Sequence, residues 1–180
     1  MESQVQQLTG LACRRARNLF LTHQLLCSQA VLVTLNQGFG GGLEGDIAIR
    51  IASALPEGLG GSGCLCGAVG GGVLALGLFL GGSRPEGRVR RRVQAASKEL
   101  HDLFRGKFGS TCCRILSKNS IADPKKHFNQ CADLTGEAAG MTAGILLSGR
   151  PELVERAVWP YLERVDSAAG AALRRVAGFL

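Results

Sequence analysis

Apolar residues recur at helical spacing in the first part of the chain. The pattern begins near Leu8, breaks between His23 and Cys27, and resumes up to Leu35. A break in an otherwise periodic stretch indicates the end of one helix and the start of another. The sequence therefore predicts two helices in this region, with their junction at Cys27.

A third helix is predicted over residues 43–55, after a glycine-rich loop at residues 36–42. Proline cannot donate a backbone hydrogen bond, so this helix is expected to end before Pro56. Its apolar face is expected to consist of Ile47, Ile51 and Ala54.

The stretch from Gly58 to Gly82 has no charged side chain, which raises the question of a membrane span. A spanning helix needs about 20 predominantly apolar residues. Only residues 73–80 are strongly apolar, and the glycines at 58–63 predict a loop. Gly67 and Gly71, four residues apart, would let a second backbone approach. We therefore expect a buried central helix, with a membrane span as the alternative.

The clearest amphipathic helix is predicted over residues 88–108, where charged residues face away from an apolar stripe. The stripe consists of Val89, Val93, Ala96, Leu100, Leu103 and Phe104. The basic run from Arg84 to Arg92 is interpreted as the solvated start of this helix rather than as a site for phosphate or lipid headgroups.

Three further elements are predicted toward the C-terminus. A short helix follows Ser110 or Thr111, either of which suits an N-cap position. A helix rich in small residues runs from Pro124 to Leu147. The last segment is expected to be an amphipathic helix, bent or interrupted at Trp159-Pro160. Its apolar stripe consists of Leu153, Val154, Ala157, Val158, Leu162 and Val165.

These elements predict an all-α protein, a compact helical bundle around a central glycine-rich apolar helix. The composition agrees, because Ala, Leu and Gly are abundant and aromatic residues are scarce. A chain of 180 residues is long enough for one substantial core. We expect a cysteine-rich helical domain over residues 1–150 and a helical extension over residues 151–180, packed on that domain or on a partner subunit.

The chain carries 21 Lys and Arg against 14 Asp and Glu, a formal net charge of +7. Basic residues are not interleaved with aromatic residues that could stack on bases, so no specific nucleic-acid binding is expected. No Ser/His/Asp order, paired carboxylates or nucleotide-binding loop supports a hydrolase. The N-terminus lacks the pattern of a secretory signal, which favours a cytoplasmic location.

Cysteines are the strongest chemical signal in the sequence. The seven are Cys13, Cys27, Cys64, Cys66, Cys112, Cys113 and Cys131. An odd number of thiols in a reducing compartment is not expected to form a structural disulfide framework. Metal binding or redox chemistry is therefore the leading interpretation, although Cys13 is well explained as a core residue.

Cys27, Cys66 and Cys113 each fall at or near the predicted start of a helix, whereas Cys131 lies inside one. Unpaired backbone N–H groups and the helix dipole favour negative charge at a helix N-terminus. We therefore expect these positions to lower the pKa of the thiols and to stabilise the thiolates that metal binding and disulfide exchange both require.

Four ordered blocks of the sequence carry a family resemblance. They are CSQAVLVTL, GLGGSGCLCGAVGGGVLALGL, FGSTCCRIL and a cysteine eighteen residues further on. Together they resemble the redox-active family named for its spaced pattern C-GCAxxG-C-C, over residues 16–147. The resemblance implies that the family cysteines are Cys27, Cys66, Cys113 and Cys131.

The central block departs from the family motif at two positions. Leu65 stands in place of its first glycine, and Gly67 in place of its alanine. Two registers are therefore open in each cysteine pair. The functional thiols are either Cys64 or Cys66, and either Cys112 or Cys113.

The family is similar to one domain of split-Soret cytochromes, which implies an iron–sulfur cluster, most readily [2Fe–2S], held by four thiolates. No C-x-x-C-H haem-attachment sequence occurs, so haem does not carry over. The leading hypothesis is an electron-transfer or redox-sensing protein that works with a redox partner protein. Its four thiols are expected to meet in space. The expected ligands are Cys27, Cys66, Cys113 and Cys131, with Cys64, Cys112 and His127 as alternates.

Two other functions stay open. One is a thiol–disulfide oxidoreductase without metal, in which cysteine pairs such as Cys64/Cys66 or Cys113/Cys131 cycle directly. The other is a structural zinc site, although the close C-x2–4-C pairs that are common in zinc sites are absent from the sequence. The sequence leaves open whether the protein is an enzyme, with oxidoreductase as the class considered.

Three further expectations concern the surroundings of the thiols and the assembly. His127 is interpreted as a solvent-facing residue, with ligation of a metal as the alternative. Arg114, Lys125 and Lys126 could offset the negative charge of a ligated cluster. The apolar stripe of the last segment suggests a two-fold homodimer, the commonest oligomer.

Overall fold

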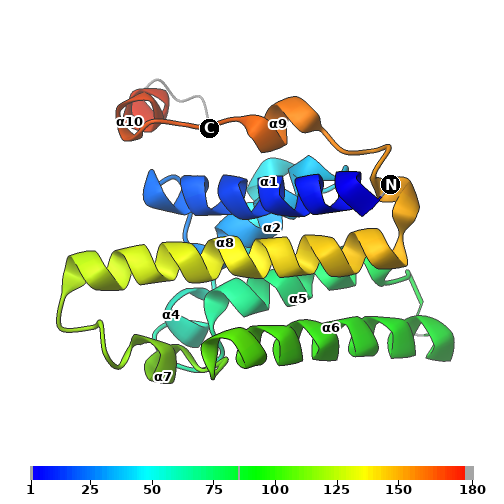
Figure 1. Ribbon diagram of the computed structural model, residues 1–180, viewed down its shortest axis with the longest axis horizontal. Helices are drawn as coiled ribbons and strands as arrows, with labels where there is room; N and C mark the ends of the chain where they lie inside the picture. The colour runs from blue at the N-terminus through cyan, green and yellow to red at the C-terminus, as the bar shows by residue number, and fades with distance from the viewer. Residues whose placement is uncertain (1, 85, 177–180) are drawn as a thin grey trace.

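The computed structural model describes residues 2–84 and 86–176. Within these ranges it consists of helices, turns and loops without a β-strand, so the predicted all-α class is confirmed. The elements, shown in Figure 1, are α1 (Glu2–Leu21), α2 (Cys27–Gly38), α3 (Gly45–Ala52), α4 (Pro56–Leu59), α5 (Gly67–Leu80), α6 (Gly87–Phe108), α7 (Cys113–Ser117), α8 (Pro124–Gly149), the 3-10 turn η1 (Pro151–Leu153), α9 (Trp159–Glu163) and α10 (Ala168–Val176).

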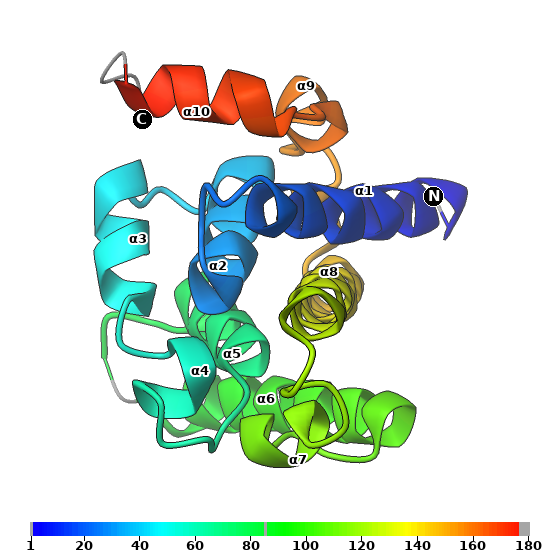
Figure 2. The same cartoon turned by 90° about the vertical axis from the view of Figure 1, so that its left-hand side faces the viewer.

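Helix α8 lies at the centre of the bundle, in contact with α1, α2, α5 and α6 (Figures 1 and 2). Its glycines let α1 approach closely, because a Cβ atom on Gly136 would lie 2.9 Å from the carbonyl oxygen of Cys13. A Cβ on Gly140 would lie 3.2 Å from the Cβ of Cys13. Cys13, on α1, therefore packs against α8, but it is half-buried and lies outside the hydrophobic core, so its interpretation as a core residue is wrong.

Helix α5 is the buried, glycine-rich helix that the sequence predicts. Gly71 faces the backbone of α2, since a Cβ atom there would lie only 2.4 Å from the carbonyl oxygen of Ser28. A Cβ on Gly72 would lie 2.5 Å from Oγ1 of Thr142 in α8. Larger residues would force the helices apart. None of the described helices is long and apolar enough to cross a membrane.

The expected buried face of α3 is wrong. Ile47 and Ile51 have 38% and 48% of their surface exposed, whereas Ala48 and Ala52 are fully buried. Small side chains bring α3 close to α2, where the hydroxyl of Ser28 donates a hydrogen bond of 2.8 Å to the carbonyl of Ala52. The close approach buries the alanine face and turns the larger isoleucines outward.

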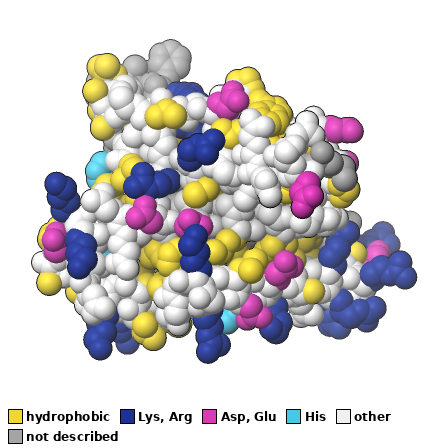
Figure 3. Space-filling model, viewed as in Figure 1, with side chains coloured by type: hydrophobic (Ala, Val, Ile, Leu, Met, Phe, Trp, Pro, Cys, Tyr) yellow, Lys and Arg dark blue, Asp and Glu magenta, His cyan; other side chains and the backbone are white. Residues whose placement is uncertain are grey.

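The amphipathic stripe of α6 is largely confirmed. Ala96, Leu100 and Phe104 are buried, while Leu103 is exposed. Figure 3 shows Lys and Arg side chains gathered at the lower right, over the start of α6. This agrees with the interpretation of the basic run at residues 84–92 as a solvated surface.

The starts of α7 and α8 are set by different residues. Helix α7 begins one to two residues later than the predicted cap, with Cys112 at the N-cap, and the hydroxyl of Ser110 accepts a hydrogen bond from the Cys112 backbone N–H. Helix α8 begins as predicted, because Asp123 caps it by accepting a hydrogen bond of 3.0 Å from the Lys126 N–H.

The last segment is divided into η1, α9 and α10 rather than forming one amphipathic helix. The interruption falls before Trp159, because Pro160 suits the first turn of α9. Leu162 is buried against α2, where a Cβ on Gly38 would lie 2.6 Å from its side chain. Part of the predicted stripe thus covers the core of the same chain, whereas Val158 and Val165 are exposed.

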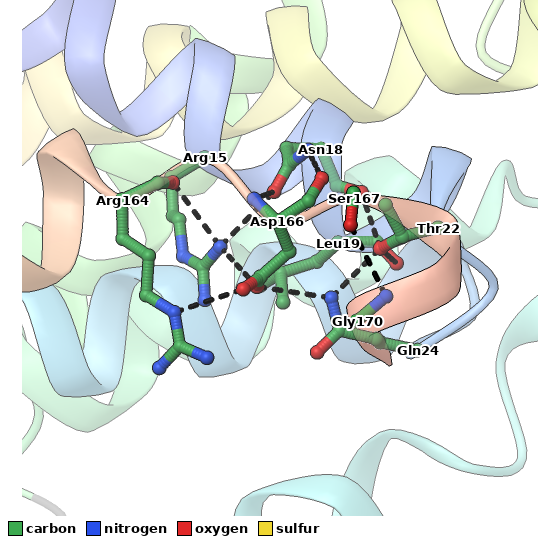
Figure 4. Close-up of polar contacts among 9 residues, drawn as sticks. All are labelled: Arg15, Asn18, Leu19, Thr22, Gln24, Arg164, Asp166, Ser167 and Gly170. Atoms are coloured by element: carbon green, nitrogen blue, oxygen red, sulfur yellow. Dashed lines mark hydrogen bonds and ion pairs between the residues drawn. The ribbon is translucent and has the colours of Figure 1, made fainter. Parts of the chain in front are cut away.

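A polar network also joins the last segment to α1 (Figure 4). The Asp166 carboxylate accepts hydrogen bonds from Arg15 at 2.9 Å, from Arg164 at 2.9 Å and from Gln24 at 3.0 Å. The side chains of Arg15 and Asp166 are each only 3% exposed. Burial alone would raise the pKa of Asp166, but its hydrogen bonds and the Arg15 charge hold that pKa well below its usual range.

Candidate functional site

A cavity of about 870 Å³ opens at the end of the bundle where α4, α7 and the starts of α5 and α8 lie together (Figure 1). Four cysteines from four different elements line it. They are Cys27, the first residue of α2; Cys66, directly before α5; Cys113, the first residue of α7; and Cys131, inside α8. The cysteines that the family resemblance implies therefore share one cavity.

The competing cysteines lie elsewhere. Neither Cys64 nor Cys112 lines the cavity. Cys13, on α1, packs against α8. All seven cysteines are free thiols. The structure thus separates the two members of each close cysteine pair, one facing the cavity and one not.

The loop before α5 brings Cys66 beside α7 through two backbone hydrogen bonds. The Cys66 N–H donates to the Thr111 carbonyl at 2.7 Å, and the Arg114 N–H donates to the Gly63 carbonyl at 2.9 Å. Glycine is required at Gly58, which has a φ of +73° and whose added Cβ would lie 2.7 Å from the backbone nitrogen of Cys64. Gly58 thus helps the loop to position Cys66, as the sequence predicts for the glycines of this loop.

Gly67 leaves the space that the sulfur of Cys27 occupies. A Cβ atom on Gly67 would lie 2.6 Å from that sulfur and 2.9 Å from the carbonyl oxygen of Leu55. The departure from the family motif at this position, glycine in place of alanine, therefore matches the packing of Cys27 against the start of α5.

The expected lowering of the thiol pKa is wrong for the cysteines of the cavity. Burial raises the pKa of Cys66 and of Cys131 to about 12, and it raises the pKa of Cys27 and Cys113 as well. The helix-start effect exists, since the backbone N–H groups of Ala68 and Val69 lower the pKa of Cys66. Desolvation outweighs it, because these thiols lie in a largely apolar cavity.

The four thiols also interact with one another. The pKa of Cys66 is raised further by the charges of Cys27 and Cys113, and the same two groups raise the pKa of Cys131. Like charges disfavour one another only at short range. A cation bound among the four sulfurs would relieve this repulsion.

His127 is half-buried at the cavity, so its interpretation as a solvent-facing residue is wrong. Its Nε2 lies 3.7 Å from the sulfur of Cys131, and its Nδ1 lies 3.2 Å from the hydroxyl of Ser120. The spacing of four residues on one helix places His127 and Cys131 on the same face. His127 can therefore orient Cys131 or exchange a hydrogen bond with it.

Aromatic side chains that the sequence does not single out form part of the cavity wall. Phe128 stacks on Phe20, with ring centroids 5.0 Å apart, and on His23, at 4.6 Å. These residues come from the end of α1, the turn after it and the first turns of α8. No sequence spacing links them, because only the contact between α1 and α8 brings them together.

Charged groups at the cavity differ in part from the expectation. Arg114 lines it, with its guanidinium donating to the Ser62 carbonyl at 2.6 Å, and Lys118 lines it as well. Lys125 and Lys126 are exposed and do not line it. Glu57 is an additional acidic residue at the cavity, and its charge raises the pKa of Cys113 and Cys131.

The described side chains contain no group of three or more His, Cys, Asp or Glu residues placed to hold a single metal ion.

Comparison with known proteins assigns the chain to a family. A family model described as "Putative redox-active protein (C_GCAxxG_C_C)" matches residues 25–145. The chain belongs to the C_GCAxxG_C_C family. The match covers more than half of the sequence and includes all four cavity cysteines. Searches of the curated proteins and of the solved structures gave no match.

Proposed function

We propose that this member of the C_GCAxxG_C_C family holds an iron–sulfur cluster on Cys27, Cys66, Cys113 and Cys131 and serves in electron transfer or redox sensing. The observation that carries the proposal is that four cysteines from four separate elements line one cavity. Four thiolates are the usual complement for a [2Fe–2S] cluster, which is the cofactor we propose.

The residues of the cavity fit such a group. Backbone groups of Ser28 and Glu57 lower the pKa of Cys27, and those of Ala68 and Val69 lower the pKa of Cys66, although burial outweighs them and raises both pKa values. Hydrogen bonds of this kind stabilise a negatively charged sulfur, which ligation requires. Arg114 and Lys118 supply positive charge at the cavity.

A cluster suits the arrangement better than a single zinc ion. Zinc draws its sulfur ligands to about 2.3 Å from one point, and no three of the described ligand-type residues are arranged in that way. A two-iron cluster distributes its ligands over two metal ions. Four thiols on separate elements around one cavity could supply two ligands to each iron.

When bound, the cluster would supply one-electron transfer. The residues of the chain would hold and tune it. Apolar and aromatic walls, including Phe128 and Leu134, limit the access of water, and His127 would orient Cys131 through the contact at 3.7 Å. Arg114 is fixed beside the cavity by its bond to Ser62, so its charge would favour the reduced form.

A thiol–disulfide oxidoreductase is the second candidate, since all the cavity cysteines are free thiols. Exchange requires a thiolate as the nucleophile. Burial keeps the pKa of Cys66 and Cys131 at about 12, so both are protonated at neutral pH. This environment suits thiols that lose their protons to a metal more than thiols that attack a disulfide.

The two candidates differ in colour and in electron count. The protein, purified without oxygen, is expected to be brown and to titrate with one electron, because a [2Fe–2S] cluster absorbs in the visible and takes up one electron. A colourless protein that remains colourless after anaerobic reconstitution with iron and sulfide, yet exchanges disulfides in a two-electron reaction, would replace the first candidate with the second.

We also propose a redox partner protein and a two-fold homodimer. Val158, Val165 and Leu173 are large apolar residues of the last segment that are exposed in the described chain. The expected cytoplasmic location rests on the sequence alone.

A further inference from the structure

Two thiols outside the cavity form a pair of their own. Cys64 and Cys112 lie on neighbouring segments, with the Cys112 thiol bonded to the residue directly before Cys64, although 47 residues separate the two cysteines in the sequence. Cys64 is exposed and Cys112 is half-buried. Neither residue lines the cavity. The pair is therefore accessible from solvent and distinct from the four thiols described above.

The backbone holds the two segments that carry these residues side by side. Hydrogen bonds from Cys66 N–H to the Thr111 carbonyl and from Arg114 N–H to the Gly63 carbonyl flank them on both sides. The Cys112 thiol in addition donates to the Gly63 carbonyl at 3.0 Å. The Cys112 sulfur is thus held at the residue next to Cys64, and a disulfide between the two would require Cα atoms about 4.4–6.8 Å apart.

We propose that Cys64 and Cys112 are a second redox pair, which forms a disulfide on the outer side of the cavity and ties the loop that carries Cys66 to the segment that carries Cys113. The inference goes beyond the proposed function and does not depend on it, because the pair lies outside the cavity whether or not a cluster is bound.

The oxidant is a low-molecular-weight disulfide, RSSR, of the glutathione type. The Cys64 thiolate, after loss of its proton, attacks one sulfur of RSSR, which forms a mixed disulfide and releases RS⁻. The Cys112 thiolate then attacks the Cys64 sulfur, which forms the Cys64–Cys112 bond and releases the second RS⁻. The protein loses two protons and two electrons, and RSSR gains them to give two RSH.

Exposure makes Cys64 the thiol that meets the oxidant first. Cys66, two residues further on, is buried, so a bulky disulfide reaches Cys64 more readily. Cys112 is the resolving thiol because its sulfur is held at the Gly63 carbonyl, next to Cys64. Cys13 packs against α8 instead. It therefore serves as the control position.

The test uses the full chain treated with oxidised glutathione, digested after Lys and Arg without reduction, and analysed by mass spectrometry. Cys64 and Cys66 share the peptide 51–88, and Cys112 and Cys113 share the peptide 108–114. The two peptides are expected to be linked in the wild type and in C13S, C66S and C113S. The link is expected to be lost in C64S and C112S.

Fragmentation of the linked wild-type peptides assigns the bonded sulfurs directly, so the test holds even if C66S or C113S does not fold. Oxidation is also expected to raise the melting temperature of the wild type by several degrees, and to leave that of C64S unchanged, because a disulfide restricts the unfolded chain. A link that survives in C64S or C112S, or a wild type that carries only mixed disulfides, would overturn the proposal.

Discussion

At the scale of single residues, the position of the cavity thiols depends on glycines that leave room for sulfur. Gly67 is the clearest case, because a Cβ atom there would lie 2.6 Å from the Cys27 sulfur. The contact involves the start of α5 and the start of α2, two of the elements that carry cavity cysteines. A methyl group at Gly67 would therefore disturb both the packing and the cavity.

Gly67→Ala is expected to destabilise the fold by about 1–3 kcal/mol, because the added methyl has no space between Cys27 and the Leu55 carbonyl. Urea unfolding measures the effect. The matched control is Gly77→Ala in the same helix, where a Cβ would meet nothing within 4 Å. The control is expected to be neutral or to gain up to about 1 kcal/mol from helix propensity. Equal effects of the two substitutions would contradict this account of Gly67.

The sequence predicts the residues of the cavity better than their chemistry. Cys27, Cys66, Cys113 and Cys131 follow from the spacing of the family motif, and all of them line the cavity. Their raised pKa values could not be predicted, because a helix start is visible in sequence and the burial of its first residue is not. Phe20, at the end of α1, gave no signal for the same reason.

At the scale of elements, a buried ion pair is one of the contacts that hold the last segment to the bundle. Arg15 on α1 and Asp166, between α9 and α10, are both almost inaccessible to solvent. Removing one partner of a buried pair leaves the other charge uncompensated. The attachment of this segment to α1 is therefore expected to depend on pH.

Asp166→Asn is expected to cost about 3–5 kcal/mol at neutral pH. Because the folded-state pKa of Asp166 is lowered, its stabilising contribution is present above the unfolded-state value of about 4 and is lost as the pH falls below it. Thermal unfolding from pH 7 to pH 3 should therefore show the difference between wild type and variant shrinking below about pH 4.

Asp133→Asn is the control for this prediction. Asp133 pairs with Arg17 on α1 at 2.7 Å, but the two side chains are 58% and 44% exposed. An exposed pair contributes at most about 1 kcal/mol. A loss for Asp133→Asn as large as that for Asp166→Asn, or a difference for Asp166→Asn that stays constant down to pH 3, would contradict the role given to the buried pair.

The bounds of a helix were predictable where a single sequence signal determines them. The periodicity of α6 and the proline at the start of α8 led to bounds close to those observed. The face of α3 was not predictable, since close approach to α2 favours alanine over isoleucine at the contact. The last segment was only partly predictable, because Pro160 opens a helix as readily as it interrupts one.

At the scale of the whole molecule, the bundle brings residues from α2, α5, α7 and α8 to one end (Figure 2). The cysteines are far apart in the sequence, from position 27 to position 131. Only the packing of these helices brings them together. The glycines of α5 and α8 allow that packing, because larger side chains would separate the helices that carry the thiols.

The choice between neighbouring cysteines also belongs to this scale. The family resemblance favours Cys66 and leaves Cys64 as an alternative, and only the path of the loop directs Cys66 into the cavity and Cys64 out of it. The same holds for Cys113 and Cys112. The central claim is therefore that the cavity cysteines, rather than their neighbours, hold the cluster.

Iron and acid-labile sulfide, measured per chain after anaerobic reconstitution of matched serine variants, test that claim most directly. The wild type, C64S and C112S are expected to bind about two irons and two sulfides, as a [2Fe–2S] cluster requires, while C66S and C113S lose the cluster. Circular dichroism confirms that each variant is folded. Iron and sulfide retained in folded C66S and C113S but lost in C64S and C112S would contradict the account.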